Sequence, residues 1–219
     1  MGQRSQIYVR IKSKTKDYIK VKSKKNGKEK VDLIAQYYQW NFAERMISRA
    51  RYGIEWIKEN IEYLDWKDKQ VKLGRILDTN FNMIDVVLSS NIIKEYEEHI
   101  EWLKKNDKHN IDIDNSEGFR DYVFIGQDNN DGKLFIDVDI ENKSVKFCLT
   151  DYDLNILSPK AYMDWDYEDW KDSEYLGKES RRNCEDNIEY LETIEQMTDE
   201  DLQDFINYDY WLDMNKPLF

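Results

Sequence analysis

The amino-acid sequence predicts an α+β protein in which an N-terminal antiparallel hairpin sheet packs on a long helix. Three observations support this class. Apolar and polar residues alternate near the N-terminus, which is the period of a half-buried strand. Apolar residues then recur at spacings of four and three over about six turns, which is the period of an amphipathic helix. In residues 119–150 apolar and polar residues alternate again, which predicts a central three-stranded meander. An acidic helical C-terminal region is expected to follow it.

The first strand of the hairpin is indicated by apolar side chains at positions 7, 9 and 11, and a second by the alternation at positions 18–22. Asn26-Gly27 marks a tight turn, because both residues tolerate the positive φ angles that a type I′ turn requires. A further strand is expected at residues 31–39. The lysines around the turn are expected to be solvated, and lysines also blunt exposed sheet edges.

A long helix is expected to start at Asn41. This residue can cap the first turn, and Glu44 three positions later can complete a capping box. Gly53 predicts a close approach of another element to this helix. Only three heptads are present, which favours a helix lying across a sheet over a coiled coil. The apolar stripe of the helix consists of Ala43, Ile47, Ala50, Ile54, Ile57, Ile61 and Leu64.

The segment after the long helix is harder to assign. Residues 68–90 suggest a short helix and then either a strand or a buried helix. A helix at about residues 91–105 has apolar side chains on one face. The polar stretch 106–118 is the expected boundary between two parts, 1–106 and 107–219, which could also form one continuous domain.

The meander is expected to consist of strands at residues 119–125, 133–141 and 144–150, with a turn at Asn142-Lys143. If this turn has two residues, Asp139 lies opposite Lys146, which is an opposite-charge cross-strand pair. Asp137, Asp139 and Glu141 share one face of the middle strand, as a divalent-metal site would require. Because the other face is apolar, the favoured interpretation is the solvated face of a sheet that is covered on one side.

Acidic residues dominate the C-terminal region, which is expected to be helical. Residues 160–219 contain 18 acidic and 6 basic side chains. Ser158-Pro159 is typical of a helix start. The apolar spacing at positions 188–194 indicates an amphipathic helix. Thr198 and Asp201 resemble the capping box of a last helix.

Charge is distributed unevenly along the chain. Residues 1–30 carry 11 basic and 2 acidic side chains, whereas the rest carries 22 basic and 43 acidic ones. Such an imbalance bears on partners more than on fold. Cys148 and Cys184 are expected to be reduced thiols. Because the N-terminus lacks an apolar signal-peptide core and no apolar run has membrane-spanning length, we expect a cytoplasmic protein that does not contact membranes.

Motifs of the common enzyme classes are absent from the sequence. It contains no glycine-rich phosphate loop, no HExxH or CxxC metal motif and no GxSxG nucleophile motif. These absences exclude the easily recognised nucleotide-binding, zinc and hydrolase classes, although an enzyme with an unfamiliar site stays possible. We expect no catalytic residues, no metal and no cofactor. His99 and His109 are expected to be structural or solvated.

Two groups of residues are candidates for binding. The run from 164 to 170 alternates acids with rings and has no apolar face of helical or strand period. It fits either a solvated segment whose rings turn inward or an exposed recognition surface, because rings are frequent at interface hot spots and spaced acids imitate a phosphate backbone. The partner-binding residues of the second interpretation are Asp164, Trp165, Asp166, Glu168, Asp169 and Trp170.

The second group combines Trp40 with Arg45 and Arg49 near the start of the long helix. Arginines beside stacking rings can bind an anion or a nucleotide. The alternative is salt bridging combined with an aromatic core, since Arg51 and Glu55 are four residues apart on one helix face.

The N-terminal sequence resembles a set of phage and prophage proteins. Residues 2–10, GQRSQIYVR, and residues 37–41, YYQWN, match the opening M-G-[QT]-R and the downstream Y/H-x-W-[ND] strand end of those proteins. The likeness extends over about the first 60 residues only. It implies a phage or mobile-element source, and it carries no catalytic residues because that set is functionally uncharacterised.

Together these features favour a non-enzymatic, phage-type protein that acts in the cytoplasm of a bacterial host. Its acidic C-terminal region would inhibit a basic, nucleic-acid-handling defence protein of the host, such as a CRISPR nuclease, by imitating nucleic acid. A small-molecule or nucleotide-binding protein, or an enzyme, that uses Trp40, Arg45 and Arg49 is the alternative. Direct nucleic-acid binding by the basic arm at residues 12–30 is disfavoured, because the acidic body would repel the same polymer.

Overall fold

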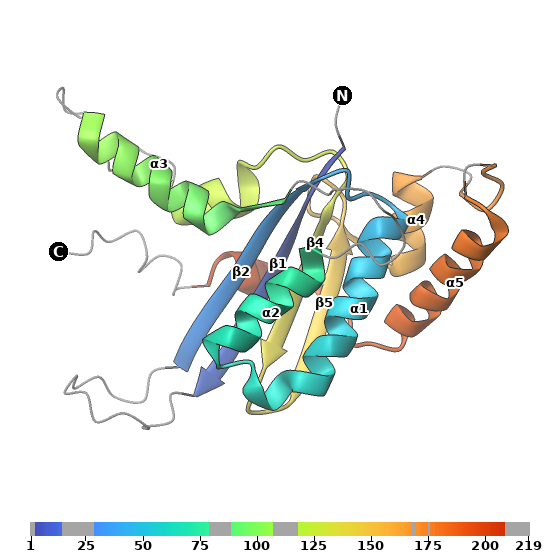
Figure 1. Cartoon of the computed structure of the whole chain (residues 1–219), viewed down its shortest axis with the longest axis horizontal. Helices are drawn as coiled ribbons and strands as arrows, with labels where there is room; N and C mark the ends of the chain where they lie inside the picture. Colours follow the sequence, from blue (N-terminus) through green and yellow to red (C-terminus); the bar gives the residue numbers. More distant parts are fainter. Residues whose placement is uncertain are drawn as a thin grey trace.

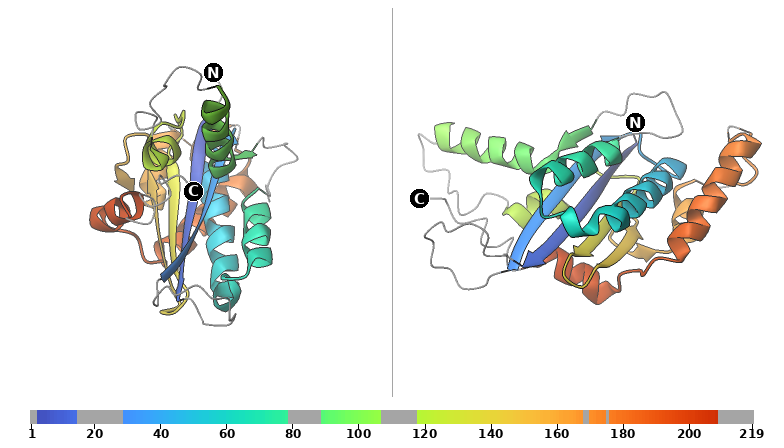
Figure 2. Two further views of the ribbon diagram at one scale, coloured as in Figure 1. Left: turned by 90° about the vertical axis from the view of Figure 1, so that its left-hand side faces the viewer. Right: turned by 60° about the horizontal axis from the view of Figure 1, so that its bottom comes forward.

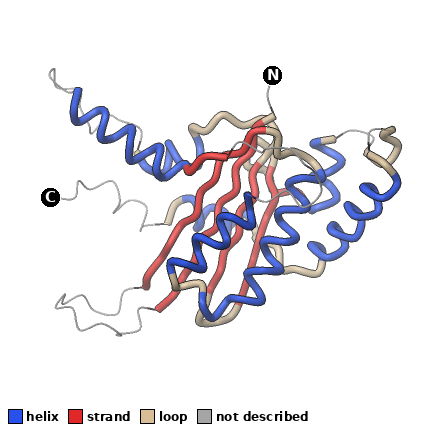
Figure 3. Tube along the Cα trace, viewed as in Figure 1, coloured by secondary structure: helices blue, strands red, loops and turns tan. Residues whose placement is uncertain are grey.

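The computed structural model describes residues 3–14, 29–78, 89–106, 118–167, 170–174 and 176–208. It confirms the predicted α+β class, with one mixed sheet and helices on both sides of it (Figure 1, Figure 3). The strands are β1 (Arg4–Lys14), β2 (Glu29–Gln39), β3 (Ser89–Asn91), β4 (Lys133–Asp139), β5 (Ser144–Thr150) and β6 (Ile156–Leu157). The helices are α1 (Glu44–Asn60), α2 (Lys67–Asp78), α3 (Ile92–Asn106), α4 (Pro159–Asp166), α5 (Lys178–Glu192) and α6 (Asp199–Ile206), with short helical turns η1 (Ile61–Tyr63) and η3 (Asp121–Ile125).

The sheet has the strand order β3-β2-β1-β4-β5-β6. β1 and β2 pair antiparallel over their whole length. The expected strand at residues 18–22, the Asn26-Gly27 turn and the uncertain segment 81–88 lie outside the described residues. At the centre, β1 runs parallel to β4, with Gln6 beside Lys133. One sheet therefore joins strands from both sides of the expected boundary at residues 106–118.

Alternating side chains of the central strands build two cores, one on each face of the sheet. The first face carries Ile7 and Ile136, and it packs against α1, α2, α4 and α5. The second face carries Tyr8 and Phe135, and it packs against α3, η3 and α6. Figure 2 shows α1 and α2 on one side of the sheet and α6 on the other. On the second face, Arg10 of β1 bridges Asp137 of β4 to Asp204 of α6.

Helix α1 confirms the predicted apolar stripe, since all of its stripe residues from 43 to 64 are buried. The stripe lies on the first face of the sheet. A Cβ atom at Gly53 would lie 2.8 Å from Cδ2 of Leu77 in α2. The predicted close approach of another element at Gly53 is therefore confirmed.

The predicted N-terminal cap of this helix is wrong. The helix begins at Glu44, and Asn41 uses its side-chain amide to donate to Oγ of Ser5 at 2.9 Å. The N–H group of Ala43 instead donates to Oδ2 of Asp166, which lies 123 positions further along the chain. A carboxylate suits this place because the first N–H groups of a helix have no acceptor within the helix. A cap supplied from such a distance leaves no local sequence signal.

The prediction of a strand at residues 119–125 is also wrong. This segment is helical, and Val123 and Phe124 are buried against the second face of the sheet. The hydroxyl of Tyr8 donates to the carbonyl of Val123 at 2.6 Å, and Nζ of Lys133 donates to the carbonyl of Phe124 at 2.9 Å. Side chains of the sheet thus donate hydrogen bonds to the carbonyl groups at the end of η3. The third strand of the meander is instead β6, which pairs with the end of β5.

Strands β4 and β5 pair two residues away from the predicted register. Asp139 lies opposite Ser144, and Lys146 lies opposite Asp137. The connecting turn has four residues rather than two, because the carboxylate of Asp139 accepts hydrogen bonds from both N–H groups of Asn142, at 2.9 and 2.7 Å. A shift of two residues keeps each side chain on its predicted face.

The predicted helix starts of the C-terminal region are confirmed. Oγ of Ser158 accepts from the N–H of Ala161 at 3.1 Å in front of α4. Thr198 and Asp201 form a capping box in front of α6. Between α5 and α6 the chain passes the edge of β5, where the N–H of Met197 donates to the carbonyl of Phe147 at 2.8 Å. The chain thereby crosses from the first face of the sheet to the second.

Both cysteines are buried free thiols, as predicted, and Cys184 belongs to the core of the first face whereas Cys148 belongs to that of the second. Burial raises the pKa of Cys184 to about 12. In the part of the chain that the structure describes, none of the helices combines the length and the apolar character that a bilayer crossing requires.

Candidate functional site

The acid and ring run at positions 164–170 does not form the exposed recognition surface that one interpretation of the sequence predicts. Trp170 is only 2 % exposed, and its indole N–H donates to Oδ1 of Asp164 at 3.0 Å. Trp165 is partly buried and packs on the ring of Tyr162, with ring centroids 5.8 Å apart. The alternative interpretation, in which the rings turn inward, describes the structure. Glu168 and Asp169 lie outside the described residues.

Asp166 also turns inward, together with the rings of this run. Its Oδ2 accepts hydrogen bonds from the N–H of Ala43 at 2.5 Å and from the hydroxyl of Tyr162 at 3.1 Å. The same hydroxyl lies 2.6 Å from the carbonyl oxygen of Asp131, so the two acidic residues are neighbours. The expectation of an exposed Asp166 is therefore wrong, because its carboxylate caps α1. Only Asp164 of the described acids in the run is exposed.

Trp40 and Arg45 are in contact, whereas Arg49 turns to other partners. Nη1 of Arg45 donates to the carbonyl of Trp40 at 2.7 Å, and Trp40 is 48 % exposed. Arg49 is buried, with its Nε donating to the carbonyl of Leu77 at 2.8 Å and its Nη1 donating to Oδ1 of Asn41 at 2.5 Å. Burial lowers the pKa of Arg49. Among the described residues, Nη2 of Arg49 has no hydrogen-bond acceptor.

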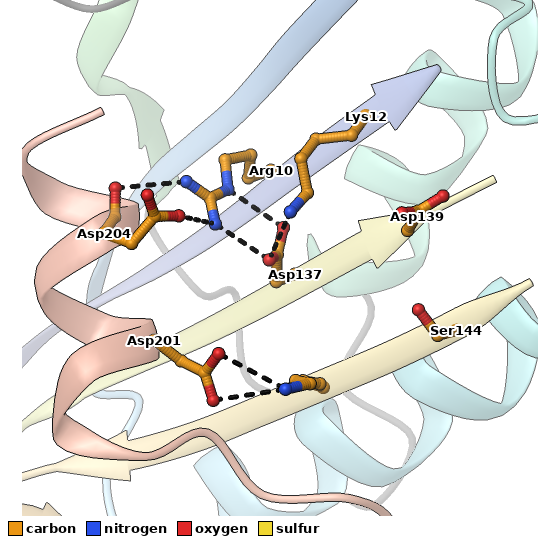
Figure 4. Close-up of a pocket in the computed structure, with 8 residues that line it drawn as sticks. Arg10, Lys12, Asp137, Asp139, Ser144, Asp201 and Asp204 are labelled. Atoms are coloured by element: carbon orange, nitrogen blue, oxygen red, sulfur yellow. Dashed lines mark hydrogen bonds and ion pairs between the residues drawn. The ribbon is translucent and has the colours of Figure 1, made fainter. Parts of the chain in front are cut away.

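A small charged basin, which the sequence analysis did not predict, opens on the second face of the sheet beside α6 (Figure 4). Its volume is about 170 Å³. Three cationic and four acidic side chains compensate one another inside it. The residues that line the basin are Arg10, Lys12, Asp137, Asp139, Ser144, Lys146, Asp201 and Asp204.

Arg10 organises one half of the basin. It is 1 % exposed, and its Nε and Nη2 donate to the two carboxylate oxygens of Asp137 at 2.9 and 2.8 Å. Its guanidinium also binds α6, with Nη2 donating to Oδ2 of Asp204 at 2.9 Å and Nη1 to the carbonyl of the same residue at 3.2 Å. Desolvation lowers the pKa of Arg10, but hydrogen bonds and charges from Asp137 and then Asp204 outweigh it, and the net shift is upward. Arg10 thus fixes α6 on the sheet.

Lys146 fixes the other end of α6. Its Nζ lies 3.2 Å from Oε1 of Glu195 and 3.3 Å from Oδ1 of Asp201. The hydrogen bond with Glu195 is the largest cause that raises the pKa of Lys146, followed by the hydrogen bond with Asp201. Figure 4 shows that Asp201 points from α6 toward the strand below it. Ion pairs on β1 and β5 therefore orient this helix.

The carboxylates of β4 do not converge as a metal site would require. Asp137 is paired with Arg10 and with Lys12, whose Nζ lies 3.0 Å from Oδ2. Asp139 is held by the turn residue Asn142. Within the described ranges, no group of three histidine, cysteine or acidic side chains is arranged to hold a metal ion. The favoured expectation of a solvated face is also wrong for Asp137, because its side chain is only 12 % exposed.

A run of exposed acids lies just beyond the run that the sequence analysis selected. Nine acidic and no basic residues occur from position 183 to position 208. In α5 the apolar spacing turns Cys184, Ile188 and Leu191 inward and leaves the acids outward. We call the exposed acids of this stretch the acidic belt, which consists of Glu185, Asp186, Glu189, Glu192, Glu195, Asp199, Glu200 and Asp204.

The segment that carries the acidic belt runs from α5 past the edge of β5 to α6 (Figure 1). Its last acid, Asp204, lines the basin. Glu195 pairs with Lys146 and Asp204 pairs with Arg10. Within the described part of the chain, the other six belt residues have no ion pair. Comparison of the chain with protein-family models, with curated protein sequences and with solved structures finds no match in any of the three. The function is therefore argued from this geometry.

Proposed function

We propose that this protein is a non-enzymatic interaction protein that binds a basic, nucleic-acid-handling protein through the acidic belt. The observation that carries the proposal is the run of exposed acids from position 183 to position 208, a stretch that contains no lysine or arginine. Such a concentration of negative charge attracts a positively charged surface and accelerates association at low salt. The rigid attachment of α6 by Arg10 and Lys146 supports the proposal, because a fixed array of charges loses little entropy on binding.

The charge density of α5 is suited to a surface that binds phosphates. Four acids, Glu185, Asp186, Glu189 and Glu192, span about 10 Å of helix axis, over which a DNA duplex carries about six phosphates. The helix therefore offers roughly two thirds of the charge of a duplex over the same length. That density supports competition for a basic groove and does not require an atom-by-atom copy of the duplex.

The proposed partner is a nuclease of a host defence system, such as a CRISPR effector, in the cytoplasm of a bacterial host. The resemblance of residues 2–10 to phage and prophage proteins supports this choice of partner. A nuclease of this kind holds its substrate in a positively charged channel. Occupation of that channel by the acidic belt would exclude the nucleic acid and thereby inhibit the nuclease.

Neutralising the exposed acids of α5 tests the proposal. The variant E185Q/E189Q/E192Q changes three solvated side chains and leaves the ion pairs of α6 intact, so we expect it to fold like the parent chain. Basic proteins captured from a bacterial lysate on the immobilised parent chain, and identified by mass spectrometry, should be retained at least tenfold less by this variant.

A matched control separates local charge from net charge. The variant E97Q/E98Q/E101Q neutralises three exposed acids on α3, which lies elsewhere on the molecule. It changes the net charge by the same amount and should retain the captured proteins as well as the parent chain does. Equal loss in both triple variants, or no loss in either, would overturn the role of the acidic belt.

Nη2 of the buried Arg49 has no hydrogen-bond acceptor among the described residues. This observation favours a second candidate function, the binding of a small anion or a nucleotide. A buried guanidinium without a carboxylate partner is costly, and a bound anion would compensate it. Thermal unfolding against phosphate, pyrophosphate and ATP should then show a stabilisation of about 2.7 kcal/mol at a hundredfold excess over the dissociation constant. R49K should lose this stabilisation, and R182K on the surface of α5 should keep it. No shift with any of the three anions would dismiss this candidate.

A further inference from the structure

A buried pair of carboxyl groups joins three segments that are distant in the sequence. Asp166 at the end of α4 caps the N-terminus of α1, and Asp131 in the loop before β4 is only 4 % exposed. The hydroxyl of Tyr162 lies between them, 2.6 Å from the carbonyl oxygen of Asp131 and 3.1 Å from Oδ2 of Asp166. The N–H of Asp131 donates to the carbonyl of Arg4 at 3.0 Å, so the loop is fixed to β1 as well.

Tyr162 brings the two acidic residues together, and carboxyl groups that lie this close hydrogen-bond to each other only when one of them retains a proton, because two ionised carboxylates offer only acceptors. No lysine or arginine of the described residues forms an ion pair with either group, and Oδ2 of Asp131 meets no donor there. The charged or titratable groups around the pair are Glu44 of α1, Tyr162 of α4, Cys184 of α5 beside Glu44, and the Arg4–Asp128 ion pair of β1 and the loop.

The backbone of Ala43 shows that the pair holds the chain in a costly conformation. Ala43 has φ 45° and ψ −121°, in a region that side chains other than glycine rarely adopt. Such a conformation costs of the order of 1–3 kcal/mol and persists only when its surroundings enforce it. Asp166 supplies the enforcing contact through the N–H of this residue.

We propose that Asp131 and Asp166 form a proton-dependent latch, which holds the end of α4 on the start of α1 while the two carboxyl groups share a proton and loosens when both are ionised. The inference is independent of the acidic belt. Loosening removes the attraction between the carboxyl groups, places two like charges in contact and lets Ala43 relax. It also frees the ring of Trp165, which packs against Tyr162 in the closed state.

The burial of the two carboxyl groups determines whether the stability of the protein rises or falls with pH. Desolvation is the largest cause that raises the pKa of Asp131 to about 6 and the pKa of Asp166 to about 7. Between about pH 4 and pH 7 the native protein therefore retains protons that the unfolded chain has released, and stability falls as pH rises through this window. Carboxyl groups with the ordinary pKa of aspartate would leave stability unchanged over the same window.

Amide hydrogen exchange tests the latch. In the parent chain, the protection factor of the Ala43 N–H should fall at least tenfold from about pH 5 to about pH 8, since a shift of one pKa unit corresponds to tenfold. D131N supplies an N–H donor in place of the shared proton, so its protection factor should change by less than about threefold over this range. D164N alters an exposed acid two positions away and should behave like the parent chain.

If D131N does not fold, NMR and fluorescence measurements on the parent chain still test the latch. The carboxyl ¹³C signals of Asp131 and Asp166 should both titrate above the ordinary range of aspartate, and the fluorescence of Trp165 should change over the same pH interval. Ordinary titration of both carboxyl groups, or an Ala43 protection factor that is constant with pH, would overturn the latch.

Discussion

Replacing Gly132 by alanine is expected to destabilise the protein by about 2–5 kcal/mol. Gly132 has φ 81°, and an added Cβ atom would lie 2.1 Å from the carbonyl oxygen of Thr150 and 3.0 Å from the ring of Tyr162. The first neighbour is backbone of the central sheet and the second is buried, so neither moves without disturbing the core. Urea unfolding of the purified variant measures the loss.

Gly177 provides the control for this substitution. It has φ −56° in front of α5, and a Cβ atom there would meet nothing within 4 Å. G177A should therefore change the free energy of unfolding by less than about 1 kcal/mol. If G132A unfolds at the same urea concentration as G177A, the backbone around the loop before β4 is not as described.

Replacing Arg10 by methionine is expected to cost about 3–5 kcal/mol, because a buried acid then loses its partner. Asp137 is 12 % exposed on its side chain and would keep only Lys12. The same change releases Asp204 and removes the cation that stacks on Phe205, 4.7 Å from the ring centroid. The result should be both a lower free energy of unfolding and faster amide exchange in α6.

The control for R10M is a substitution of Lys12, the other cation that contacts the carboxylate of Asp137. Lys12 is 21 % exposed on its side chain and contacts Asp137 only at its Nζ. K12M should cost about 1 kcal/mol or less, as partly solvated ion pairs do. Equal losses in R10M and K12M, or unchanged exchange in α6 of R10M, would contradict the role of Arg10 as the anchor of this helix.

Elements whose information is local could be predicted from the sequence. The stripe of α1 and the capping box before α6 are written in residues within one or two turns of each other, and both are present. The parallel pairing of β1 with β4 could not be predicted in this way. Arg10 and Asp137 are 127 positions apart, and only the closed sheet brings them together.

The difference between local information and contacts over long sequence distances also explains which parts of the candidate site could be predicted. Asp166 carries the local signature of a surface acid, but its true role as the cap of α1 depends on a contact over 123 positions. The acidic belt, in contrast, could have been found from the sequence. The inward spacing of Cys184, Ile188 and Leu191 places the intervening acids outward, and the absence of lysine and arginine from position 183 to position 208 marks the surface.

Competition with DNA tests the central claim most directly, namely that the acidic belt occupies a nucleic-acid site on a basic partner. The partner captured on the parent chain is challenged with a short DNA duplex at constant ionic strength. We expect the duplex to displace the partner in proportion to its concentration, and binding to weaken steeply with added salt. A partner that stays bound under excess duplex, or that binds equally well to E185Q/E189Q/E192Q, would contradict this claim.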